Sequence, residues 1–275
     1  MGLIKVLHIL EIGGSVSIMS HFFNKLKAGK SHHIYHKKNK ISSTVSHYYD
    51  GQPIDRFFLL MLSSFFKSFS YDIIHIHSEE LLIPIFKLTG KKVVLHYHGS
   101  DINDLNRSKK RIRVWCRSRA DAIFYNGKDM LEKITTEKNI KKIYLPNPID
   151  TDLFKSNMQK KYGNLILVSS NLDKQKTVSE AKKHGTLEII DLDLQQIPYY
   201  FMPKILSKYE FYFDIKIMPW GQKLKDLSNT ALQALACGCK VFHDDKEIRE
   251  FPNQFKPENV VEKLLKTYEE ILKIN

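Results

Sequence analysis

The feature that most constrains the fold of this chain is the alternation of short apolar runs with segments of helical length. Strands that are apolar throughout and alternate with helices are typical of a parallel sheet covered on both faces. In the first half of the sequence we predict strands at residues 4–10, 71–77, 91–98, 120–126 and 141–146, with a weaker one at 32–38.

Two prolines interrupt the alternation in the segment LPNPID, residues 145–150, and a second set of runs follows. Prolines at such a point are typical of a domain boundary. We therefore predict two doubly wound α/β domains, residues 1–150 and 151–275, with the second shortened. The last helix is a candidate to pack back toward the first domain. Beyond the boundary we predict strands at 164–170, 186–192, 211–219 and 239–244, and helices at 198–208, 226–237 and 257–273.

The excess of basic charge lies in the first part of the chain. The net charge is +13, and residues 1–163 contain 27 basic and 14 acidic side chains, whereas residues 164–275 contain 16 of each. Such a field attracts phosphates on nucleic acid, anionic lipid or a phosphorylated substrate. The segment at 107–119 contains seven basic residues with apolar positions at helical spacing. It is either a solvated helix or a site for phosphate or an anionic surface.

Three cysteines in 275 residues do not indicate a disulfide scaffold, so a reducing compartment is expected. Residues 1–10 fit a strand rather than a secretory leader. The longest apolar run, residues 57–66, is far shorter than the roughly 20 residues that span a bilayer. The run is predicted to be a core-facing helix, with a helix that touches a membrane surface as the alternative. We predict a cytoplasmic protein, with a peripheral location at the inner membrane face as a second possibility.

Two His-x-His pairs stand near the ends of predicted strands, His75 with His77 and His96 with His98. Alternate residues of a strand share one face, so each pair lines one face of the sheet. A zinc site needs three or four ligands, and a third is not evident, so we predict no metal site. Ligands of parallel sheets bind beyond the carboxyl ends of the strands. His98 and Asp101 are therefore the functional candidates, and His96 is predicted to be structural.

Two further segments have the composition of ligand-binding turns. Gly13 and Gly14 follow the first strand, where they allow close approach of a ligand to the backbone or simply form a turn. The segment at 219–242 places lysines before a helix that opens with DLSNT. The amino end of that helix and the lysines beside it would form an anion cradle, although a helix without a ligand can have the same features.

In their order along the chain, these segments resemble the family-four (group 1) retaining glycosyltransferases of GT-B fold. The form HYHGSD is similar to that of archaeal members with a shortened second domain. The segments that carry the resemblance are KVLHILEIGGSVS, DIIHIHS, VVLHYHGSDI, ADAIFYNGKDM, YLPNPIDTDLF and LQALACGCKVF.

The resemblance implies two Rossmann-like domains that face each other across a cleft. It implies a nucleotide-sugar donor held mainly by the second domain, and an acceptor on the first that is a glycan or a polyprenyl-linked lipid. The sugar would be transferred with retention, and neither a cofactor nor a catalytic metal is implied. The basic first domain would dock on an anionic membrane surface.

The resemblance also implies roles for particular residues. His98 would touch the donor sugar and orient the transfer, with support from Asp101, and both are implied to be catalytic. Gly13, Gly14 and Ser15 would approach the donor phosphate or the acceptor. The donor-binding residues implied are Lys174, Lys176, Lys223, Ser228, Asn229, Thr230 and Gln233.

The sequence departs from the family pattern at the donor site. Members often carry Glu-x7-Glu across the donor loop and helix, and the matching positions here are Lys225 and Gln233. Many members hold the diphosphate with an Arg and a Lys, whereas SSNLDKQK offers only Lys174 and Lys176. Lysine supplies a point charge without the bidentate fork of arginine.

Two other functions remain as alternatives. The loss of both glutamates favours a non-catalytic scaffold that binds a nucleotide sugar or a partner subunit. The charge of +13 alone favours a nucleic-acid-binding protein. No aromatic stacking platform accompanies that charge, so nucleic acid is the least favoured partner.

Overall fold

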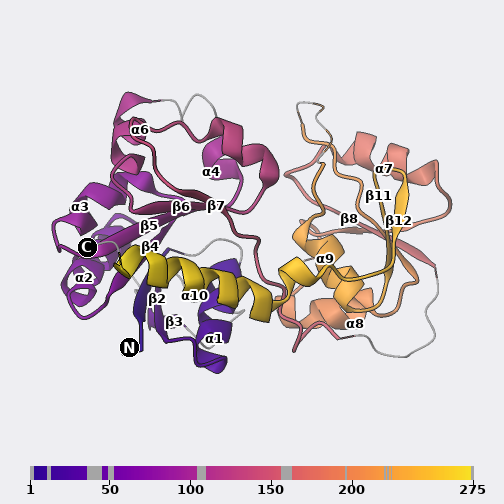
Figure 1. Ribbon diagram of the computed structural model, residues 1–275. Coiled ribbons are helices and arrows are strands. Elements are labelled where there is room, and N and C mark those ends of the chain that lie inside the picture. Colours follow the sequence, from indigo (N-terminus) through magenta and orange to yellow (C-terminus); the bar gives the residue numbers. More distant parts are fainter. Residues whose placement is uncertain are drawn as a thin grey trace. The chain divides into compact units, whose positions relative to one another are not determined.

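The computed structural model describes residues 3–10, 14–35, 45–48, 53–103, 110–155, 163–195, 197–219, 221, 223 and 225–273. The chain divides into two compact units (Figure 1). Unit 1 comprises Met1–Pro148 together with Pro257–Asn275, and unit 2 comprises Ile149–Lys256. The division falls two residues before the predicted boundary, and the last helix belongs to unit 1 rather than to the second domain.

Unit 1 contains a parallel sheet of seven strands in its described part, in the order β3-β2-β1-β4-β5-β6-β7. This is the strand order of a doubly wound fold, in which the order reverses beside β1. The strands are β1 (Lys5–Ile9), β2 (Lys30–Tyr35), β3 (Val45–Tyr48), β4 (Ile73–His77), β5 (Lys92–Tyr97), β6 (Ala122–Tyr125) and β7 (Lys142–Tyr144).

Helices cover both faces of this sheet. On one face, α2 and α3 pack on an apolar cluster that includes Leu7, Ile74 and Leu95. The opposite face, which carries the histidines of β1, β4 and β5, packs against α10, and α10 contacts α1 (Figure 1). The helices of unit 1 are α1 (Ser15–Lys25), α2 (Pro53–Ser68), η1 (Glu80–Leu82), α3 (Ile83–Lys87), α4 (Ser100–Asn103), α6 (Arg111–Arg117), η2 (Lys128–Lys133) and α10 (Pro257–Lys273).

The helix α10 returns to unit 1 because its apolar face matches the sheet there. It starts at Pro257, a residue suited to the first turn of a helix. Its side chains Val260, Leu264 and Tyr268 are buried. The hydroxyl of Tyr268 lies 2.5 Å from Nδ1 of His75 on β4. The predicted second domain of residues 151–275 therefore ends at Lys256.

Unit 2 contains a five-stranded sheet in its described part, in the order β12-β11-β10-β8-β9. The strands are parallel except β12, which pairs antiparallel with β11. The predicted strand 211–219 is short, because the chain leaves the sheet at Asp214. The elements are β8 (Asn164–Val168), α7 (Lys174–Lys182), β9 (Glu188–Asp191), η3 (Tyr199–Phe201), α8 (Met202–Leu206), β10 (Phe211–Phe213), α9 (Asn229–Ala236), β11 (Lys240–His243), β12 (Lys246–Ile248) and η4 (Asn253–Phe255).

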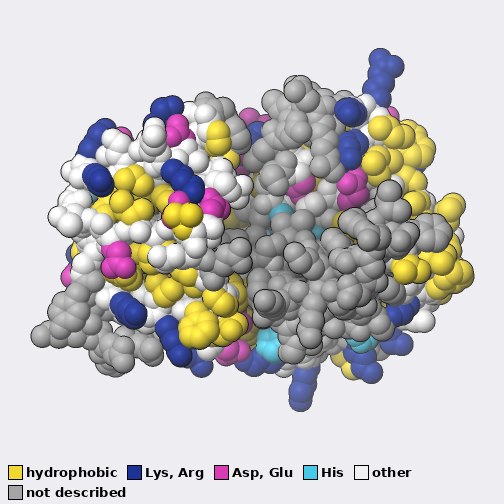
Figure 2. Space-filling model, turned by 180° about the vertical axis from the view of Figure 1, so that it is seen from behind, with side chains coloured by type: hydrophobic (Ala, Val, Ile, Leu, Met, Phe, Trp, Pro, Cys, Tyr) yellow, Lys and Arg dark blue, Asp and Glu magenta, His cyan; other side chains and the backbone are white. Residues whose placement is uncertain are grey.

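Among the described helices, none is both long and apolar enough to cross a bilayer. Hydrophobic side chains nevertheless gather on part of the surface of unit 1, at the right of Figure 2. The helices α2 and α3 lie at this part of the molecule (Figure 1).

We predict that Tyr268 anchors α10 to unit 1. Tyr268→Ala should lower the free energy of unfolding by about 3 to 5 kcal/mol, because it removes a fully buried ring. Tyr268→Phe should cost about 1 kcal/mol, since it removes only the hydroxyl that pairs with His75. Urea unfolding followed by circular dichroism measures both values. Tyr200→Ala, at an exposed tyrosine of unit 2, is the control, and equal stability of Tyr268→Ala and this control would contradict the anchor.

Candidate functional site

Three neighbouring strands of unit 1 end in residues with positive φ. Leu10 after β1 has φ 73°, Ser78 after β4 has φ 67°, and Gly99 after β5 has φ 130°. For Leu10 and Ser78 this backbone conformation is uncommon and strained. The strain is concentrated at the carboxyl edge of the sheet, where ligands of doubly wound folds bind.

Asp101 holds the turn that follows β5. Its Oδ2 accepts hydrogen bonds from the backbone N–H of His98 at 2.9 Å and from the hydroxyl of Ser78 at 2.5 Å. Its Oδ1 accepts from the N–H groups of Gly99 at 2.8 Å and Ile102 at 3.0 Å. Four donors use the lone pairs of this carboxylate. Asp101 therefore positions the backbone of His98 and has no oxygen left to act on a substrate.

The side chain of His98 belongs to a series of hydrogen bonds that links Asn147, His98, His77 and His8. Its Nδ1 lies 3.1 Å from Oδ1 of Asn147, and its Nε2 lies 2.9 Å from Nδ1 of His77. The Nε2 of His77 lies 3.0 Å from Nδ1 of His8. A neutral imidazole has one donor and one acceptor. With a neutral His98 that donates to Oδ1 of Asn147, the protons of His98, His77 and His8 would all be on Nδ1.

This arrangement limits what His98 can do. The predicted direct contact with a sugar needs a ring nitrogen, and both ring nitrogens of His98 already have partners within unit 1. A sugar hydroxyl could reach one only by displacing Asn147 or His77. His98 lies at the carboxyl edge with its ring held by Asn147 and His77, which suits it to orient a ligand.

The other histidines of the cluster are buried and neutral. His8, His75, His77 and His96 are all 0% exposed. Burial, with the proximity of His33, lowers the pKa of His8 to about 3. Burial also lowers the pKa values of His75, His77 and His96 well below the usual value, and neighbouring histidines add to the effect. The predicted structural role of His96 agrees with this burial.

The same cluster contains the residues that could hold a metal ion. In each of two overlapping groups, His8 with His75 and His77, and His77 with His96 and His98, the ring nitrogens lie within 4.8 Å of one another. We predicted no metal site because the sequence showed no third ligand. In the structure a neighbouring strand supplies a third histidine to each pair, His8 to His75 and His77, and His77 to His96 and His98. A metal at His77 and His98 would have to replace their mutual hydrogen bond. Neutral imidazoles otherwise suit zinc and similar ions.

The glycine turn after β1 is described in part. Gly13 lies outside the described residues, so its predicted approach to a ligand stays a prediction. Gly14 has φ 83° and precedes α1, and a glycine has no side chain that could cap the helix. Ser15 is the first residue of α1 and is buried, with 5% exposure. The backbone of this turn, rather than the Ser15 side chain, is what a ligand could reach.

In unit 2, the structure pairs both lysines of α7 with carboxylates. The Nζ of Lys174 lies 2.6 Å from Asp191 and 2.6 Å from Asp193. The Nζ of Lys176 lies 3.0 Å from Asp173, whose carboxylate also caps α7 by accepting from the Lys176 N–H. The amino end of α7 thus already holds an anion. In this arrangement neither lysine is placed for the predicted contact with a diphosphate.

The start of α9 presents the remaining predicted donor residues. Ser228 caps the helix, since its Oγ accepts from the N–H of Ala231 at 3.1 Å. Asn229 is exposed, and Thr230 and Gln233 are half-buried. Residues three and four apart on a helix share a face, so Asn229, Thr230 and Gln233 form one polar surface. Ser228 is committed to the cap, whereas the other three are accessible.

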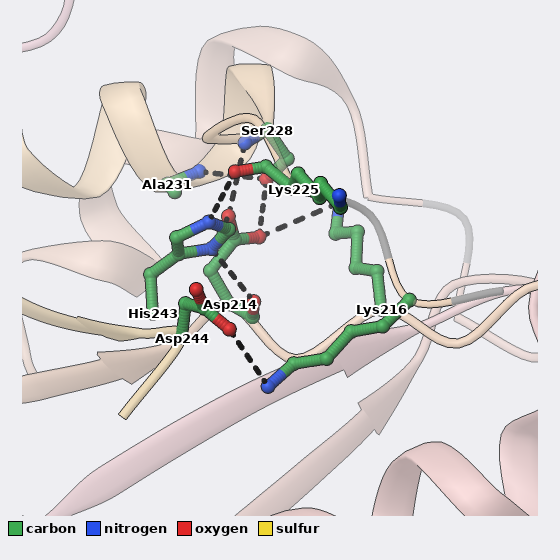
Figure 3. A network of polar contacts seen from close by, with 8 residues as sticks. Asp214, Lys216, Lys225, Ser228, Ala231, His243 and Asp244 are labelled. Carbon is green, nitrogen blue, oxygen red and sulfur yellow. Dashed lines mark hydrogen bonds and ion pairs between the residues drawn. The ribbon is translucent and has the colours of Figure 1, made fainter. Parts of the chain in front are cut away.

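A buried ion pair that the sequence analysis missed fixes the start of α9 (Figure 3). Asp214, which follows β10 and is 2% exposed, accepts from the N–H of Ser228 at 2.9 Å and from its hydroxyl at 2.6 Å. Nδ1 of His243, at the end of β11, lies 3.1 Å from the same carboxylate. The Nε2 of His243 lies 2.9 Å from the carbonyl oxygen of Lys225. This cluster ties the loop before α9 to two strands.

His243 is an imidazolium in this cluster. Both of its ring nitrogens face only acceptors, and a neutral ring would offer one donor. The hydrogen bond to Asp214 raises the pKa of His243 to about 9, although burial opposes the shift. Burial alone would raise the pKa of Asp214, but His243, Lys216 and Ser228 together hold it below its usual value.

Lysines surround this cluster. The Nζ of Lys216 lies 4.0 Å from Asp214 and points toward it (Figure 3). The Nζ of Lys223 lies 3.5 Å from Asp244. Asp214 and His243 could have been found from the sequence, because both stand at carboxyl ends of strands, as His98 does. In the sequence they lie within FYFDIK and KVFHDD. These segments were interpreted only as apolar strands, so their polar residues were not singled out.

We predict that unit 2 loses stability at alkaline pH through His243. Because the folded pKa of about 9 exceeds the ordinary value of 6.5, the stabilisation is complete below pH 6.5 and is lost as the pH rises through 9. The loss is at most about 3 kcal/mol. Urea unfolding between pH 6 and 10 measures it. His243→Phe should flatten this dependence and the control His184→Phe should keep it, so a wild-type curve unchanged across this range would contradict the ion pair.

Comparison with known proteins agrees with this architecture. Residues 17–153 match the family model of Glycosyltransferase Family 4. No curated protein matches the sequence. Among solved structures, the chain is similar to AviGT4, a glycosyltransferase involved in avilamycin A biosynthesis, with a TM-score of 0.59, 9% identity and 99% of each chain covered.

Two further structures are similar over the full chain. The pneumococcal O-GlcNAc transferase GtfA, in complex with UDP and GlcNAc, has a TM-score of 0.57, with 12% identity over 99% of this chain and 100% of that one. The UDP-GlcNAc 2-epimerase of Methanocaldococcus jannaschii has a TM-score of 0.58, with 12% identity over 97% and 100%. Such identities show the fold alone, and one of these proteins is an epimerase, so sugar transfer follows from the family match. Through residues 17–153 the chain belongs to glycosyltransferase family 4, and its two Rossmann-like units have the GT-B fold.

Proposed function

We propose that this protein transfers a sugar from a nucleotide-sugar donor to an acceptor, with retention at the anomeric carbon and without a catalytic metal. The observation that carries the proposal is the carboxyl edge of unit 1, within the family-matched residues. There His98 is held by Asp101 through the backbone and by Asn147 through the ring. A glycosyltransferase needs such a fixed polar group where the sugar reacts.

The donor diphosphate would bind at the start of α9 rather than at α7. Lys174 lies 2.6 Å from each of two carboxylates, whereas Lys216 and Lys223 make only longer contacts, at 4.0 and 3.5 Å, with one carboxylate each. Together with Lys225 they precede α9 in the chain. Transfer separates the sugar from a diphosphate, on which negative charge develops. Cations and a helix amino end stabilise such charge. In this proposal His243 contributes by holding the loop in place.

His98 would orient the sugar once a sugar hydroxyl displaces Asn147 or His77 from one of its ring nitrogens. The hydrogen bonds to Asn147 and His77 hold the imidazole in one orientation, so its role in this scheme is to position the sugar. A metal is not required in this scheme, because His77 and His98 already satisfy each other. The retained configuration rests on the family resemblance.

The donor that we propose is a uridine diphosphate sugar. The structure of GtfA holds UDP and GlcNAc, which makes uridine diphosphate sugars the first donors to test. The acceptor would be a glycan or a polyprenyl-linked lipid, as the family resemblance implies. Glycan biosynthesis at the cytoplasmic side of a membrane would fit both.

We predict that His98→Ala lowers kcat for sugar transfer by roughly 100-fold, because the loss is one of positioning. Donor hydrolysis and transfer, measured by nucleotide release, should be unaffected by EDTA in the wild type. His21→Ala, at an exposed histidine of unit 1, is the matched control. Full activity in His98→Ala would remove His98 from the mechanism, and loss of wild-type activity with EDTA would contradict the metal-free scheme.

We predict that Lys223→Ala weakens donor binding by roughly 10-fold, since a charge-assisted contact is lost. A thermal-shift screen of nucleotide sugars against their nucleoside diphosphates identifies the donor, and calorimetry then gives the affinity. Lys204→Ala, on the surface of α8, is the control. Donor binding without turnover on any acceptor would favour the non-catalytic scaffold, and unchanged affinity in Lys223→Ala would contradict the placement of the diphosphate.

A further inference from the structure

One histidine of the buried cluster lacks the hydrogen bonds that the others form. His96 is 0% exposed, yet neither of its ring nitrogens has a hydrogen bond of ordinary length and angle among the described residues. The backbone of Leu145 is near enough to favour an N–H on this ring, which leaves the lone pair of the other nitrogen unused. Buried polar atoms without a partner are rare, and a bound water molecule or ion is a common explanation. His96 therefore points to a ligand inside the cluster.

Two other imidazoles lie beside His96. The strands β4 and β5 pair in parallel with His77 opposite His96, and His98 follows directly after the end of β5. The ring centre of His96 lies 4.2 Å from that of His98 and 5.5 Å from that of His77. One nitrogen from each of the three rings lies within 4.8 Å of the other two. Three imidazoles thus lie together near the carboxyl edge of the sheet.

The spacing of His77 and His98 is close to that of two ligands of one metal ion. Their facing nitrogens, Nδ1 of His77 and Nε2 of His98, are 2.9 Å apart. In a tetrahedral zinc site with Zn–N distances of about 2.0 to 2.1 Å, two ligand nitrogens are about 3.3 Å apart. His96 would complete the set by a rotation of its ring, which no hydrogen bond of ordinary geometry to the described residues opposes. The fourth ligand would be water at the carboxyl edge, where His98 is half-buried.

The other nitrogens of these rings have the partners that metal-binding histidines need. A histidine that binds a metal usually donates its second N–H to a nearby acceptor, which fixes the orientation of the ring. For His98 the acceptor is Oδ1 of Asn147, 3.1 Å from Nδ1. For His77 it is Nδ1 of His8, 3.0 Å from Nε2. With an ion bound, His77 and His8 would carry their protons on Nε2, and no ring would change its charge.

The ligand atoms determine the class of ion. Imidazole nitrogens suit zinc, copper, nickel and similar divalent ions, whereas magnesium and calcium prefer oxygen ligands. The carboxylate beside the site, Asp101, already accepts four hydrogen bonds and has no lone pair left for a metal. The site therefore offers three nitrogens and no carboxylate oxygen from Asp101, which favours an ion of the zinc type.

We propose that His77, His96 and His98 bind a divalent transition-metal ion of the zinc type. The ion takes the place of the hydrogen between His77 and His98, and the ring of His96 turns toward it. This binding does not depend on sugar transfer. Its consequence rests on the proposed function: with Nε2 of His98 on the ion and Nδ1 on Asn147, no ring nitrogen is left for a sugar, so the ion inhibits transfer instead of catalysing it.

The test is calorimetric titration of the full chain with zinc chloride, after removal of metals with EDTA and without any donor. The wild type should bind one equivalent of zinc tightly and should not respond to magnesium chloride. Cobalt chloride is the spectroscopic probe, since tetrahedral cobalt absorbs visible light. His96→Phe should weaken zinc binding by at least roughly 100-fold, more than the loss of an outer hydrogen-bond partner costs, and should abolish the cobalt absorption.

His96→Phe should stay folded, because phenylalanine has a ring of similar size and no hydrogen bond of ordinary geometry to the described residues is lost. Thermal unfolding without metal checks this, and added zinc should raise the midpoint of the wild type but not that of the variant. His98→Ala removes a half-buried ligand instead and should weaken zinc binding as well, which keeps the test decisive if His96→Phe does not fold.

The matched control is His75→Phe, because His75 is equally buried but belongs only to the neighbouring group of histidines. This control should bind zinc as the wild type does. Wild-type protein that takes up no zinc, or equal zinc binding by the wild type and His96→Phe, would overturn the proposal. Loss of binding in His75→Phe but not in His96→Phe would overturn it in favour of the neighbouring group. A failure of sugar transfer in the assays above would leave these measurements unchanged, so the two proposals fail separately.

Discussion

The constraint on which unit 1 depends is the burial of imidazoles inside a parallel sheet. His8, His75 and His77 lie on a face that an all-apolar strand would fill with Ile or Val, and a buried ring nitrogen is stabilised by a partner. For each of these three rings the fold provides one, from another histidine or from the hydroxyl of Tyr268. The helix α10 is therefore needed by unit 1 for its hydrogen bond as well as for its apolar side chains. The chain of imidazoles that starts at His8 ends at His98, which connects the interior of the sheet to its carboxyl edge.

Unit 2 also buries a histidine, but this histidine, His243, is charged instead of neutral. At its carboxyl edge His243 is surrounded by a carboxylate and two carbonyl oxygens, so it is protonated and pairs with Asp214. In unit 1 the histidines meet other histidines, and burial keeps them neutral. The two edges thus differ in their response to pH. Titration at alkaline pH affects the loop before α9, whereas burial lowers the pKa values of His75, His77 and His96 well below the usual value.

The sequence-based predictions were accurate where a local pattern is sufficient. Apolar runs separated by helical segments predicted the parallel sheets. The division between the two units falls inside the proline-containing segment 145–150. Strand alternation predicted a structural role for His96, and the side chain is 0% exposed. The donor-binding lysines were harder to predict from the sequence. A lysine that is free to bind a diphosphate cannot be distinguished there from a lysine that pairs with a carboxylate. Lys174 meets Asp191 and Asp193 only after β9 lies beside β8.

The sequence by itself determined the doubly wound class, the excess of cations in the first part and the polar residues that follow the strands, because these depend on spacing and composition. Tertiary structure decided which of those residues are committed to one another. Hydrogen bonds and ion pairs depend on separations of about 3 Å between residues distant in the chain, and no local pattern encodes such separations. Asp101 accepts hydrogen bonds that fix the turn after β5. His98 is hydrogen-bonded to His77, and Asp214 with His243 fixes the start of α9. The side of α2 that carries Leu60 and Phe65 was likewise buried only through packing on the core of unit 1.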